Sequence, residues 1–508
     1  MLDATSTTCL KGTRVVLLKE IRDWIVDLKA RQVYWLNGIA GVGKSTVART
    51  IAGEADDMKI LGASFFFSRA LGRTESKVVF ATIALQLAQQ LHSFKVELIA
   101  SLEKNPDAGD TMMHPQRQLR KLIIEPLKLI KNPPQTILIV FDAFDECEKE
   151  GSRQLLAQLL ANIHEIPFLK LFITSRPEHH IRMEFDVRTN VTKSILHNIE
   201  DSIVQGDIRL FLCDRLESVA VNLPDCCSGW RWSGEELEIL IIRAGKLFVF
   251  AATAIKFIMD EYTCDPRQQL DLLLGDTRKT MLESHPSHYE ELDDLYYQIL
   301  INILPPNKNA TSLVLRYQMI VGTIVLLHSP LSLEDLEALV SAPKGHASAA
   351  LLLLHSLIVV PSEPNEAPQV YHPSFPEFVT DFNRCKDMRF YINPTEHHCR
   401  ITLRCFDAMK KLRKDICRIG GRLKMNNEVA ELDSVVKQSL PGWVQYACCY
   451  WATHLESSTI GESSLVQALE TYTSNNLLYW LEALSLLGRL ELAIPLIQSA
   501  HKWAVRDN

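Results

Sequence analysis

One octapeptide near the beginning of the chain has the residue types and the spacing of a phosphate-binding loop. Gly38-Ile39-Ala40-Gly41-Val42-Gly43-Lys44-Ser45 fits G-x-x-x-x-G-K-[ST], and Thr46 adds a second hydroxyl. We expect the three glycines to adopt positive φ, so that consecutive backbone N–H groups can converge on an anion. Lys44 would bring a positive charge to the β- and γ-phosphates, and Ser45 a hydroxyl to Mg²⁺. The octapeptide therefore predicts a nucleotide site.

The residues on either side provide the strand and the helix that such a loop requires. Val33-Tyr34-Trp35-Leu36 predicts a buried strand, and residues 45–55 carry apolar positions at helical spacing. The dipole of a helix that begins at the phosphates also favours their negative charge. A glycine-rich turn that matched the pattern by chance would not have this context.

A second set of polar residues follows the apolar run Ile137-Leu138-Ile139-Val140-Phe141. Such a run is typical of a central parallel strand, and active sites of parallel sheets lie at the carboxyl ends of the strands. Asp142 is expected there to hold Mg²⁺ through water, and Asp145 and Glu146 are candidates to orient or deprotonate an attacking water. Which of these two acts stays open. The alternative is a strand that ends in acids at a solvated turn.

A further strand, Leu169–Thr174, is followed by Ser175-Arg176-Pro177. A cation at a neighbouring strand end can sense the γ-phosphate, so Arg176 is our candidate for that role. The alternative is a surface arginine in an ion pair.

Strands alternate with helices up to about residue 200, and helices dominate afterwards, which predicts an α/β domain with a mainly parallel sheet and helices on both faces, followed by helical domains. Single helices are expected over Ser76–Leu102 and Glu235–Met259, and a fifth strand at Ser194–His197. The predicted divisions are a helical lead-in (1–32), a P-loop NTPase domain (33–200), a helical domain (201–310), a winged-helix domain (311–384) and a C-terminal helical segment (385–508).

The winged-helix prediction rests on a helix at Val314–His328, a second helix that Ser332 caps, and a hairpin wing at Val359–Tyr371. Such domains often bind DNA. The second helix, however, carries three acids and lacks Lys and Arg, so we expect no nucleic-acid partner. The basic residues from Lys410 to Lys414 favour a solvated helix face over a surface for an acidic partner.

Composition limits the remaining possibilities. The 508 residues are 47 % hydrophobic and 23 % charged with a net charge of −7, which indicates globular domains without a basic field for nucleic acid. Twelve cysteines without C-x-x-C favour reduced thiols in the cytosol over a zinc module. Metal binding by the pairs His179-His180 and His397-His398 is the less favoured alternative.

The longest apolar stretches, Leu247–Met259 and Ala349–Val360, are too short to span a membrane and are expected to be buried helices. The aromatic residues beyond residue 440 are expected to form core.

With these motifs in order, the chain resembles the NACHT family of signal-transducing P-loop NTPases of the STAND class, and more narrowly the NLR-type NACHT proteins of mushroom-forming fungi. The resemblance is carried by the phosphate loop and by these segments: Cys9-Leu10-Lys11-Gly12-Thr13-Arg14, Gly62–Arg69, Asp142–Glu146, Thr174–Pro177, Leu247–Ala254 and Trp480–Leu490.

The resemblance implies a domain that binds ATP or ADP with Mg²⁺, and a resting state in which a winged-helix histidine, here His372, contacts the phosphates of ADP. Two positions depart from the family: Lys246 replaces a usual glycine, and Phe248 lies near the place of an adenine-contacting proline. Relatives usually add an N-terminal effector and C-terminal repeats, which this chain has no room for, so we expect a core that works with separate partners or a truncated form.

Our leading hypothesis is a cytoplasmic nucleotide switch: ATP replaces ADP, the winged helix moves away, the protein forms homo-oligomers, and slow hydrolysis resets it. The resemblance implies a role in fungal innate defence or non-self recognition. The alternatives are a small-molecule P-loop kinase and a scaffold, or remnant, whose bound nucleotide is only structural.

Overall fold

The computed structural model describes residues 8–104, 115–188, 190–222, 230–259, 265–274, 288–303, 311–352, 354–361, 363–419, 426–429, 431–459 and 462–505. It forms two compact units, Met1–Leu292 and Asp293–Asn508. The loop expected at residues 105–110 lies outside the described residues. Among the described residues, no helix combines the length and the apolar composition that crossing a membrane would require.

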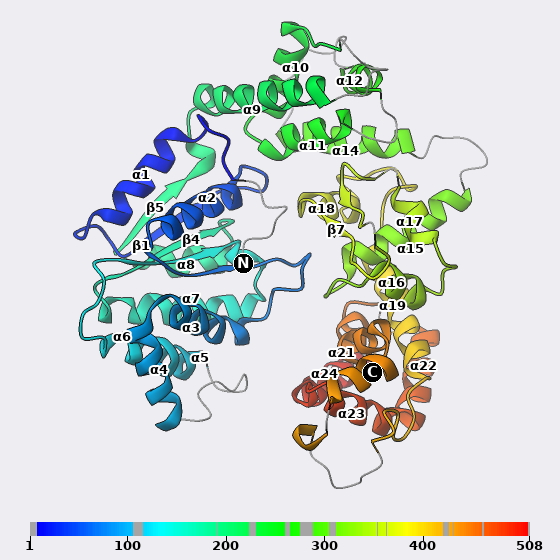
Figure 1. Ribbon diagram of the computed structural model, residues 1–508. Coiled ribbons are helices and arrows are strands. Elements are labelled where there is room, and N and C mark those ends of the chain that lie inside the picture. Colours follow the sequence, from blue (N-terminus) through cyan, green and yellow to red (C-terminus); the bar gives the residue numbers. More distant parts are fainter. Residues whose placement is uncertain are drawn as a thin grey trace. The chain divides into compact units, whose positions relative to one another are not determined.

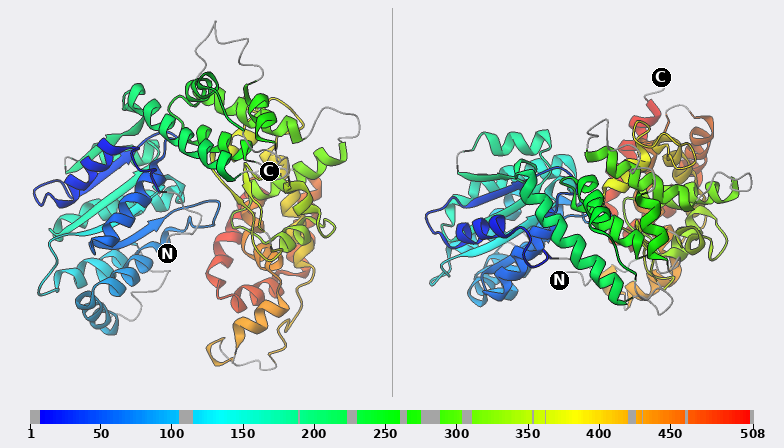
Figure 2. Two further views of the ribbon diagram at one scale, coloured as in Figure 1. Left: turned by 45° about the horizontal axis from the view of Figure 1, so that its top comes forward. Right: turned by 90° about the horizontal axis from the view of Figure 1, so that it is seen from above.

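The first unit is built on a five-stranded sheet that is parallel throughout (Figures 1 and 2). The strands lie in the order β2-β3-β4-β1-β5, with bounds β1 Val33–Asn37, β2 Leu61–Phe66, β3 Ile137–Asp142, β4 Leu169–Ser175 and β5 Val191–Ile195. This confirms the predicted α/β class. Because β4 is inserted between β1 and β3, its carboxyl end lies between the phosphate loop and Asp142.

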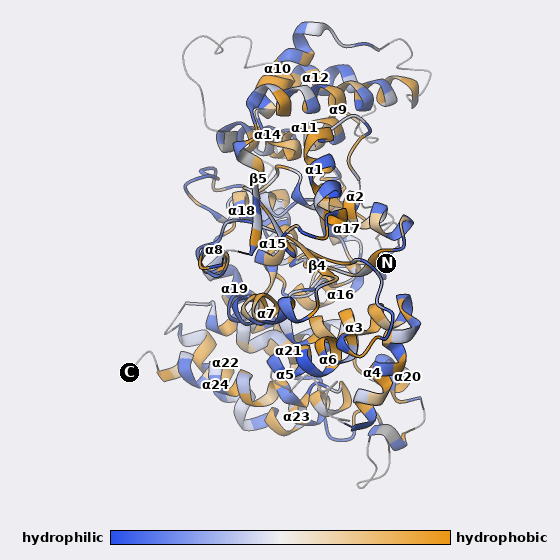
Figure 3. Cartoon of the chain, turned by 90° about the vertical axis from the view of Figure 1, so that its left-hand side faces the viewer, coloured by the Kyte–Doolittle hydropathy of each residue, from blue (hydrophilic) through white to orange (hydrophobic). Residues whose placement is uncertain are grey.

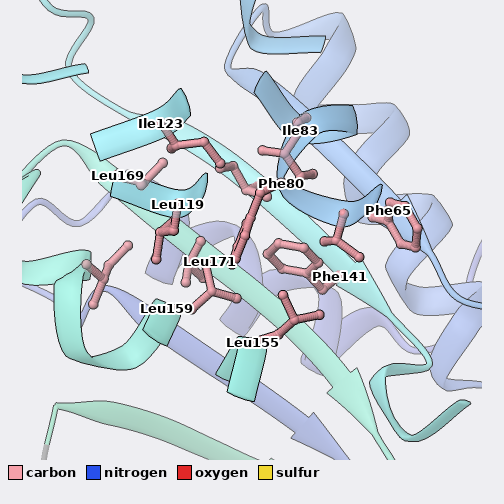
Figure 4. Packing of buried hydrophobic residues seen from close by; sticks show 14 of the residues in the cluster. Phe65, Phe80, Ile83, Leu119, Ile123, Phe141, Leu155, Leu159, Leu169 and Leu171 are labelled. Carbon is pink, nitrogen blue, oxygen red and sulfur yellow. The ribbon is translucent and has the colours of Figure 1, made fainter. Parts of the chain in front are cut away.

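Both faces of the sheet are covered by helices. On one face lie α1 (Val15–Val26) and α2 (Lys44–Asp57), and the ring of Trp24 packs 5.2 Å from that of Tyr34 in β1. Alternate strand residues point to the other face, because successive side chains of a strand alternate. There they pack with helices that span residues 79–186, as Figure 4 shows for Phe80, Phe141 and Leu155. These helices are α3 Val79–Gln90, α4 His92–Lys104, α5 Pro115–Leu119, α6 Glu125–Lys128, α7 Lys149–Asn162 and α8 His179–Asp186.

Two expected long helices are each broken into two. The helix expected over Ser76–Leu102 breaks at Leu91, whose backbone is extended (φ −123°, ψ 102°). The helix expected over Glu235–Met259 breaks at Gly245 (φ +53°), between α10 (Gly234–Ala244) and α11 (Phe248–Ile258). Glycine is the residue that most readily ends a helix in this way. The remaining helices of the first unit are α9 Asp201–Asn222 and α12 Pro266–Leu274, and the unit boundary falls within α14 (His288–Ile303).

The second unit is mainly helical, and its helices carry hydrophilic and hydrophobic residues side by side, as amphipathic helices do (Figure 3). Its only described strands are β6 (Ile358–Val359) and β7 (Gln369–Val370), which pair antiparallel where the hairpin was expected. The apolar stretch Ala349–Val360 is not one buried helix, because α17 ends at Leu351 and β6 follows. The helices are α15 Thr311–Leu326, α16 Leu333–Val340, α17 His346–Leu351, α18 Ser374–Thr380, α19 Pro394–Met409, α20 Leu432–Ser439, α21 Gly442–Glu456, α22 Ser463–Asn475, α23 Leu477–Leu486 and α24 Ala493–Val505.

Helix α16, which would be the recognition helix of a DNA-binding winged helix, is attached to α21 within the same unit. The hydroxyl of Ser332 accepts a hydrogen bond from the N–H of Asp335, so the predicted cap is confirmed. The Asp335 carboxylate in turn accepts the N–H of Trp443 (3.0 Å) in the first turn of α21. Gly442 lies so close that an added Cβ would be 2.4 Å from Asp335 Oδ2. One carboxylate therefore joins the two helices.

Replacing Asp335 by Ala should destabilise the second unit, because Trp443 N–H loses its capping acceptor, a change that costs about 1 kcal/mol. For a unit of this size that corresponds to a fall of about 2–4 °C in its melting temperature. Differential scanning calorimetry of the full chain would measure it. The matched control is Glu334→Ala, which removes an exposed ion pair with Lys344 and should leave the transition within about 1 °C. Equal shifts for both variants would contradict the capping role.

Candidate functional site

The phosphate loop connects the end of β1 to the beginning of α2, as the sequence predicts. Gly41 (φ +80°) and Gly43 (φ +92°) adopt the left-handed conformation that glycine favours. A Cβ built on Gly43 would have no atom within 4 Å, so the loop leaves open space at this point. The prediction for Gly38 is wrong: its φ is not positive, because the N–H of Gly38 continues the strand ladder by donating to the carbonyl of Ser175 (3.3 Å).

Lys44 is buried at the first position of α2. Its Nζ donates to the carbonyls of Gly38 and Ile39, both at 2.8 Å. Burial lowers the pKa of Lys44 to about 8, although the Asp145 carboxylate acts in the opposite direction. Since burying a lysine charge without anions is costly, the carboxylates around it account for part of its position.

Asp142 lies at the end of β3, fully buried, between two hydroxyl groups. Thr174 at the end of β4 donates to Asp142 Oδ1 (2.5 Å) and accepts the N–H of Ala143 (3.1 Å). Ser45 also bonds to the Asp142 carboxylate. Burial raises the pKa of Asp142, and these two hydrogen bonds act against that rise. The predicted Mg²⁺ residues, Ser45 and Asp142, are therefore in direct contact, and Thr46 lies beside them in the first turn of α2.

Asp145 and Arg176 form an ion pair across the ends of β3 and β4. Asp145 Oδ1 accepts the backbone N–H of Arg176 (2.9 Å), and Oδ2 lies 3.3 Å from Arg176 Nε. The Asp145 side chain is 7 % exposed and that of Arg176 is 25 % exposed, so the arginine is not a solvated surface residue. The structure thus brings Arg176 into the same site as Lys44.

Glu146 has different partners from Asp145. One of its carboxylate oxygens accepts the backbone N–H of Arg69 (2.8 Å), and the Arg69 side chain donates to the carbonyl of Asp145 (3.1 Å). Burial raises the pKa of Glu146 to about 7. A carboxylate with a pKa near neutrality is suited to exchange a proton with water, whereas Asp145 is engaged by a cation.

Arg14 was not among the predicted site residues, although it ends Cys9–Arg14, one of the segments that carry the family resemblance. Its Nη2 donates to the carbonyl of Val42 in the phosphate loop (2.9 Å), and its backbone N–H donates to Asp207 in α9 (3.1 Å). Its guanidinium also lies 4.9 Å from the centre of the Phe248 ring. A buried arginine held by a carboxylate 193 residues away cannot be inferred from local pattern.

The start of α11 also contacts the phosphate loop. The N–H of Val249 donates to the carbonyl of Gly41 (3.1 Å), and an added Cβ on Gly41 would be 2.3 Å from Val249 Cγ1. The other departure from the family, Lys246, donates to the carbonyl of Ile199 (2.8 Å). The helices after the sheet are therefore packed onto the loop.

His372 lies in the second unit, just before α18. Its Nδ1 accepts the backbone N–H of Ser374 (3.1 Å) and lies 2.7 Å from the Ser374 hydroxyl. These contacts position the ring at the start of the helix. Its contact with a nucleotide stays a prediction, because the site described above belongs to the first unit.

Among the described residues, no group of three or more His, Cys, Asp or Glu side chains is arranged to hold a metal ion. This does not conflict with Mg²⁺, which usually takes one or two carboxylates together with phosphate oxygens and water. The nine cysteines that the structure describes form no disulfide with one another, and six of them are buried.

The parallel sheet, the glycine loop before α2 and the acids after β3 define a P-loop NTPase domain. A family model described as "Nephrocystin 3, N-terminal" matches residues 12–176. The vegetative incompatibility protein HET-E-1 of Podospora anserina is 24 % identical over 523 aligned positions, which cover 95 % of this chain and 36 % of that protein. The resemblance to fungal NACHT proteins of the STAND class is thereby confirmed. The chain spans about a third of the length of this curated relative.

The solved structures of similar proteins match the fold of this chain only loosely. A STAND protein with a tetratricopeptide repeat sensor from Pyrococcus horikoshii has a TM-score of 0.41 and 14 % identity, covering 99 % of this chain and 65 % of its own. Cdc6p from Pyrobaculum aerophilum has a TM-score of 0.32 and 11 % identity, covering 72 % and 92 %. The fold assignment accordingly rests on the strand order and the loop.

Replacing Gly41 by Ala should weaken nucleotide binding on the order of tenfold, because a left-handed backbone costs a side-chain residue about 1–2 kcal/mol and the new Cβ would meet Val249. Titration of the purified protein with a fluorescent ADP would measure the affinity. Gly53→Ala in the interior of α2, where a Cβ meets nothing within 4 Å, is the matched control. Adding Val249→Ala should recover part of the loss, and wild-type affinity of Gly41→Ala alone would contradict the proposed contact.

Proposed function

We propose that this chain is a nucleotide-operated switch that binds ADP or ATP with Mg²⁺ and hydrolyses ATP slowly. The observation that carries the proposal is the convergence of Lys44, the bonded pair Ser45 and Asp142, and the Arg176–Asp145 pair at the carboxyl ends of three neighbouring strands. The residues fit these ligands: the loop is open at Gly43, the lysine is buried beside it, and hydroxyl and carboxylate oxygens lie within reach of one another.

In this proposal the loop N–H groups from Ile39 to Thr46 and the Lys44 ammonium bind the phosphates, and Gly38 joins the loop to β1. Ser45 and Asp142 would hold Mg²⁺, which when bound neutralises phosphate charge. Thr174 fixes the Asp142 carboxylate in place by its hydrogen bond, and thereby joins the end of β4 to the metal residues. Lys44 would exchange its bonds to the loop carbonyls for bonds to phosphate oxygens.

Arg176 supplies the sensing step. Its guanidinium is paired with Asp145 in the structure, and a γ-phosphate nearby would compete with Asp145 for the same cation. Since the pair joins β3 to β4, a change of its partner would alter the loops at the ends of both strands. Nucleotide state would thus bias the conformation of this edge of the sheet.

The remaining steps of the switch follow from the resemblance. We propose that His372 contacts the phosphates in an ADP-bound resting state, that ATP releases this contact, and that the protein then forms homo-oligomers without nucleic acid or membrane insertion. A cytoplasmic role in fungal non-self recognition is proposed because the matched relative is a vegetative incompatibility protein.

Identification of the nucleotide that the purified protein carries tests the proposal directly. The protein is denatured and the released nucleotide is identified by chromatography, with Lys44→Ala beside it and Lys59→Ala, on the turn after α2, as the matched control. We expect ADP near one equivalent in the wild type and the control, and its loss in Lys44→Ala. Addition of an ATP analogue and Mg²⁺ should then increase the mass measured by light scattering. Folded protein that neither contains nor binds nucleotide would refute the proposal, whereas bound ADP without assembly or turnover would indicate a scaffold.

Glu146 is our candidate for the group that activates water, and Asp145 for the group that holds Arg176. Glu146→Gln should lower ATP turnover by about 10²–10³-fold while nucleotide affinity stays near that of the wild type. Asp145→Asn should change affinity as well, because it removes the carboxylate that faces Lys44 and Arg176. Single-turnover hydrolysis and equilibrium binding, measured separately, distinguish the two effects. The opposite pattern would reverse the assignment.

A further inference from the structure

The second unit contains a buried cluster of titratable side chains that the nucleotide site does not use. It consists of His328, which follows α15, His398 in α19, and Tyr446 and His454 in α21. The Nδ1 atoms of His398 and His454 lie 2.7 Å apart, and His454 Nε2 lies 2.6 Å from the Tyr446 hydroxyl. The backbone N–H of His328 donates to that hydroxyl (3.1 Å). Three separate segments of the chain therefore meet in one hydrogen-bond chain, which we call the histidine cluster.

The hydrogen-bond donors of the histidine cluster can be assigned from the contacts of the Tyr446 hydroxyl. Because the Tyr446 oxygen accepts from His328, its own hydrogen is available to His454 Nε2. His454 must then carry its proton on Nδ1 and donate to His398 Nδ1. In this arrangement every contact holds one hydrogen, and both imidazole rings are neutral.

The surroundings of the histidine cluster favour neutral rings. His454 is fully buried and His398 is 8 % exposed. Burial, together with the neighbouring histidines, lowers the pKa of His454 well below its ordinary value and that of His398 to about 4. His328 Nε2 is buried and has no hydrogen-bond partner, so a proton on it would be an uncompensated buried charge.

The other titratable groups near the histidine cluster do not offset such a charge. His397 on α19 acts on His454 with the same sign, and Tyr450, Cys405 and Cys449 surround Tyr446. Two carboxylates lie at the ends of α21 and bond to groups outside the cluster: Asp335 of α16 accepts the N–H of Trp443 in the first turn, and Glu456, the last residue of α21, accepts the hydroxyl of Ser499 from α24.

Proton uptake would reverse this chain of hydrogen bonds and leave one of its hydrogens without an acceptor. A proton on His398 Nδ1 would face the one on His454, which would have to move to Nε2. Tyr446 would then accept twice, and its own hydrogen would lose its acceptor in a fully buried place. A second proton would place two imidazolium rings side by side with their Nδ1 atoms 2.7 Å apart, where their charges repel.

We propose that the histidine cluster is an acid-operated lock: it holds α19, α21 and the end of α15 together while its rings are neutral, and mild acid releases these three segments. The helix pair that it joins, α19 and α21, is otherwise held by apolar contacts such as Phe406 against Trp451. The release does not depend on the nucleotide site, which lies in the other unit.

The sign of the effect follows from the lowered pKa values. A histidine of the unfolded chain has a pKa of about 6.5. In the fold, burial lowers the pKa of His398 to about 4 and that of His454 well below its ordinary value. The stability that the neutral rings provide is therefore complete above about pH 6.5 and is lost as the pH falls toward 4. Between these values each histidine raises the opening constant about tenfold per pH unit.

Hydrogen exchange of the full chain, measured by mass spectrometry from pH 7.5 to 5.0 and corrected for intrinsic exchange rates, tests the lock. We expect protection of α19 and α21 to fall by at least tenfold per pH unit below about pH 6.5, while β1 and β3 stay protected. Unchanged protection of α19 and α21 at pH 5.0 would overturn the proposal. So would loss of protection in both units at the same pH, because that would be general acid unfolding.

A pair of variants separates the histidine cluster from other titrating groups. His398→Gln together with His454→Gln keeps hydrogen-bonding side chains that do not titrate. The pH dependence of α19 and α21 should therefore fall to about half of its wild-type slope, because His328 and His397, whose pKa values are also lowered, remain. His501→Gln, an exposed histidine of α24, is the matched control and should keep the wild-type slope. An unaltered slope in the double variant would overturn the proposal. If that variant does not fold, the wild-type pH series remains decisive.

Discussion

The burial of one lysine charge at the start of α2 is the constraint on which the first unit depends. The Lys44 ammonium donates to the loop carbonyls of Gly38 and Ile39 and faces the carboxylate of Asp145, and its pKa is lowered because burial disfavours the charge. The sheet order makes this possible. Because β4 separates β1 from β3, Thr174 and Arg176 occupy the space between the loop and the acids, and each of them holds one of those acids in place. A site built in this way responds as a unit when any member changes its partner.

Much of this could be predicted from the sequence, since the residues involved are local. A glycine loop between a strand and a helix, and acids or an arginine directly after apolar runs, are patterns a few residues long, and parallel strands bring their ends together. The same locality explains the errors. Nothing near Gly38 indicates that its N–H would continue the ladder to Ser175, and the apolar periods across Leu91 and Gly245 continue through positions where the backbone turns. Arg14, Asp207 and Val249 were missed because their contacts join segments that are far apart in the chain.

The contacts of Arg14 and Val249 also bear on how a switch of this kind would be transmitted. Both residues bond to carbonyls of the phosphate loop, and Arg14 is tied to Asp207 in α9, so the loop cannot change its shape without affecting the helices that follow the sheet. Since a packed interior shifts between discrete arrangements and does not deform continuously, such bonds favour two positions of these helices over a graded series.

The two units place titratable side chains in their interiors by opposite means. In the first unit the carboxylates of Asp145, Asp142 and Glu146 all favour the charged form of the buried Lys44, and removing one of them would leave that charge less well compensated. In the second unit His398 and His454 bond to each other and to Tyr446, and they remain neutral because each of these contacts already contains its single hydrogen. The pattern His397-His398 gave no indication of this, because a histidine pair in sequence does not identify its partners, and the only role considered for it, a metal site, was the less favoured one. The role of His398 follows from its partner, His454, which is 56 residues away in the sequence and is brought next to it only by folding.

A charge balanced by opposite charges tolerates a range of pH, whereas a cluster held together by shared hydrogens depends on the rings being neutral. Loss of stability in mild acid is therefore expected in the second unit, whereas at the nucleotide site the same pH range protonates Glu146, whose raised pKa of about 7 means that protonation favours the fold.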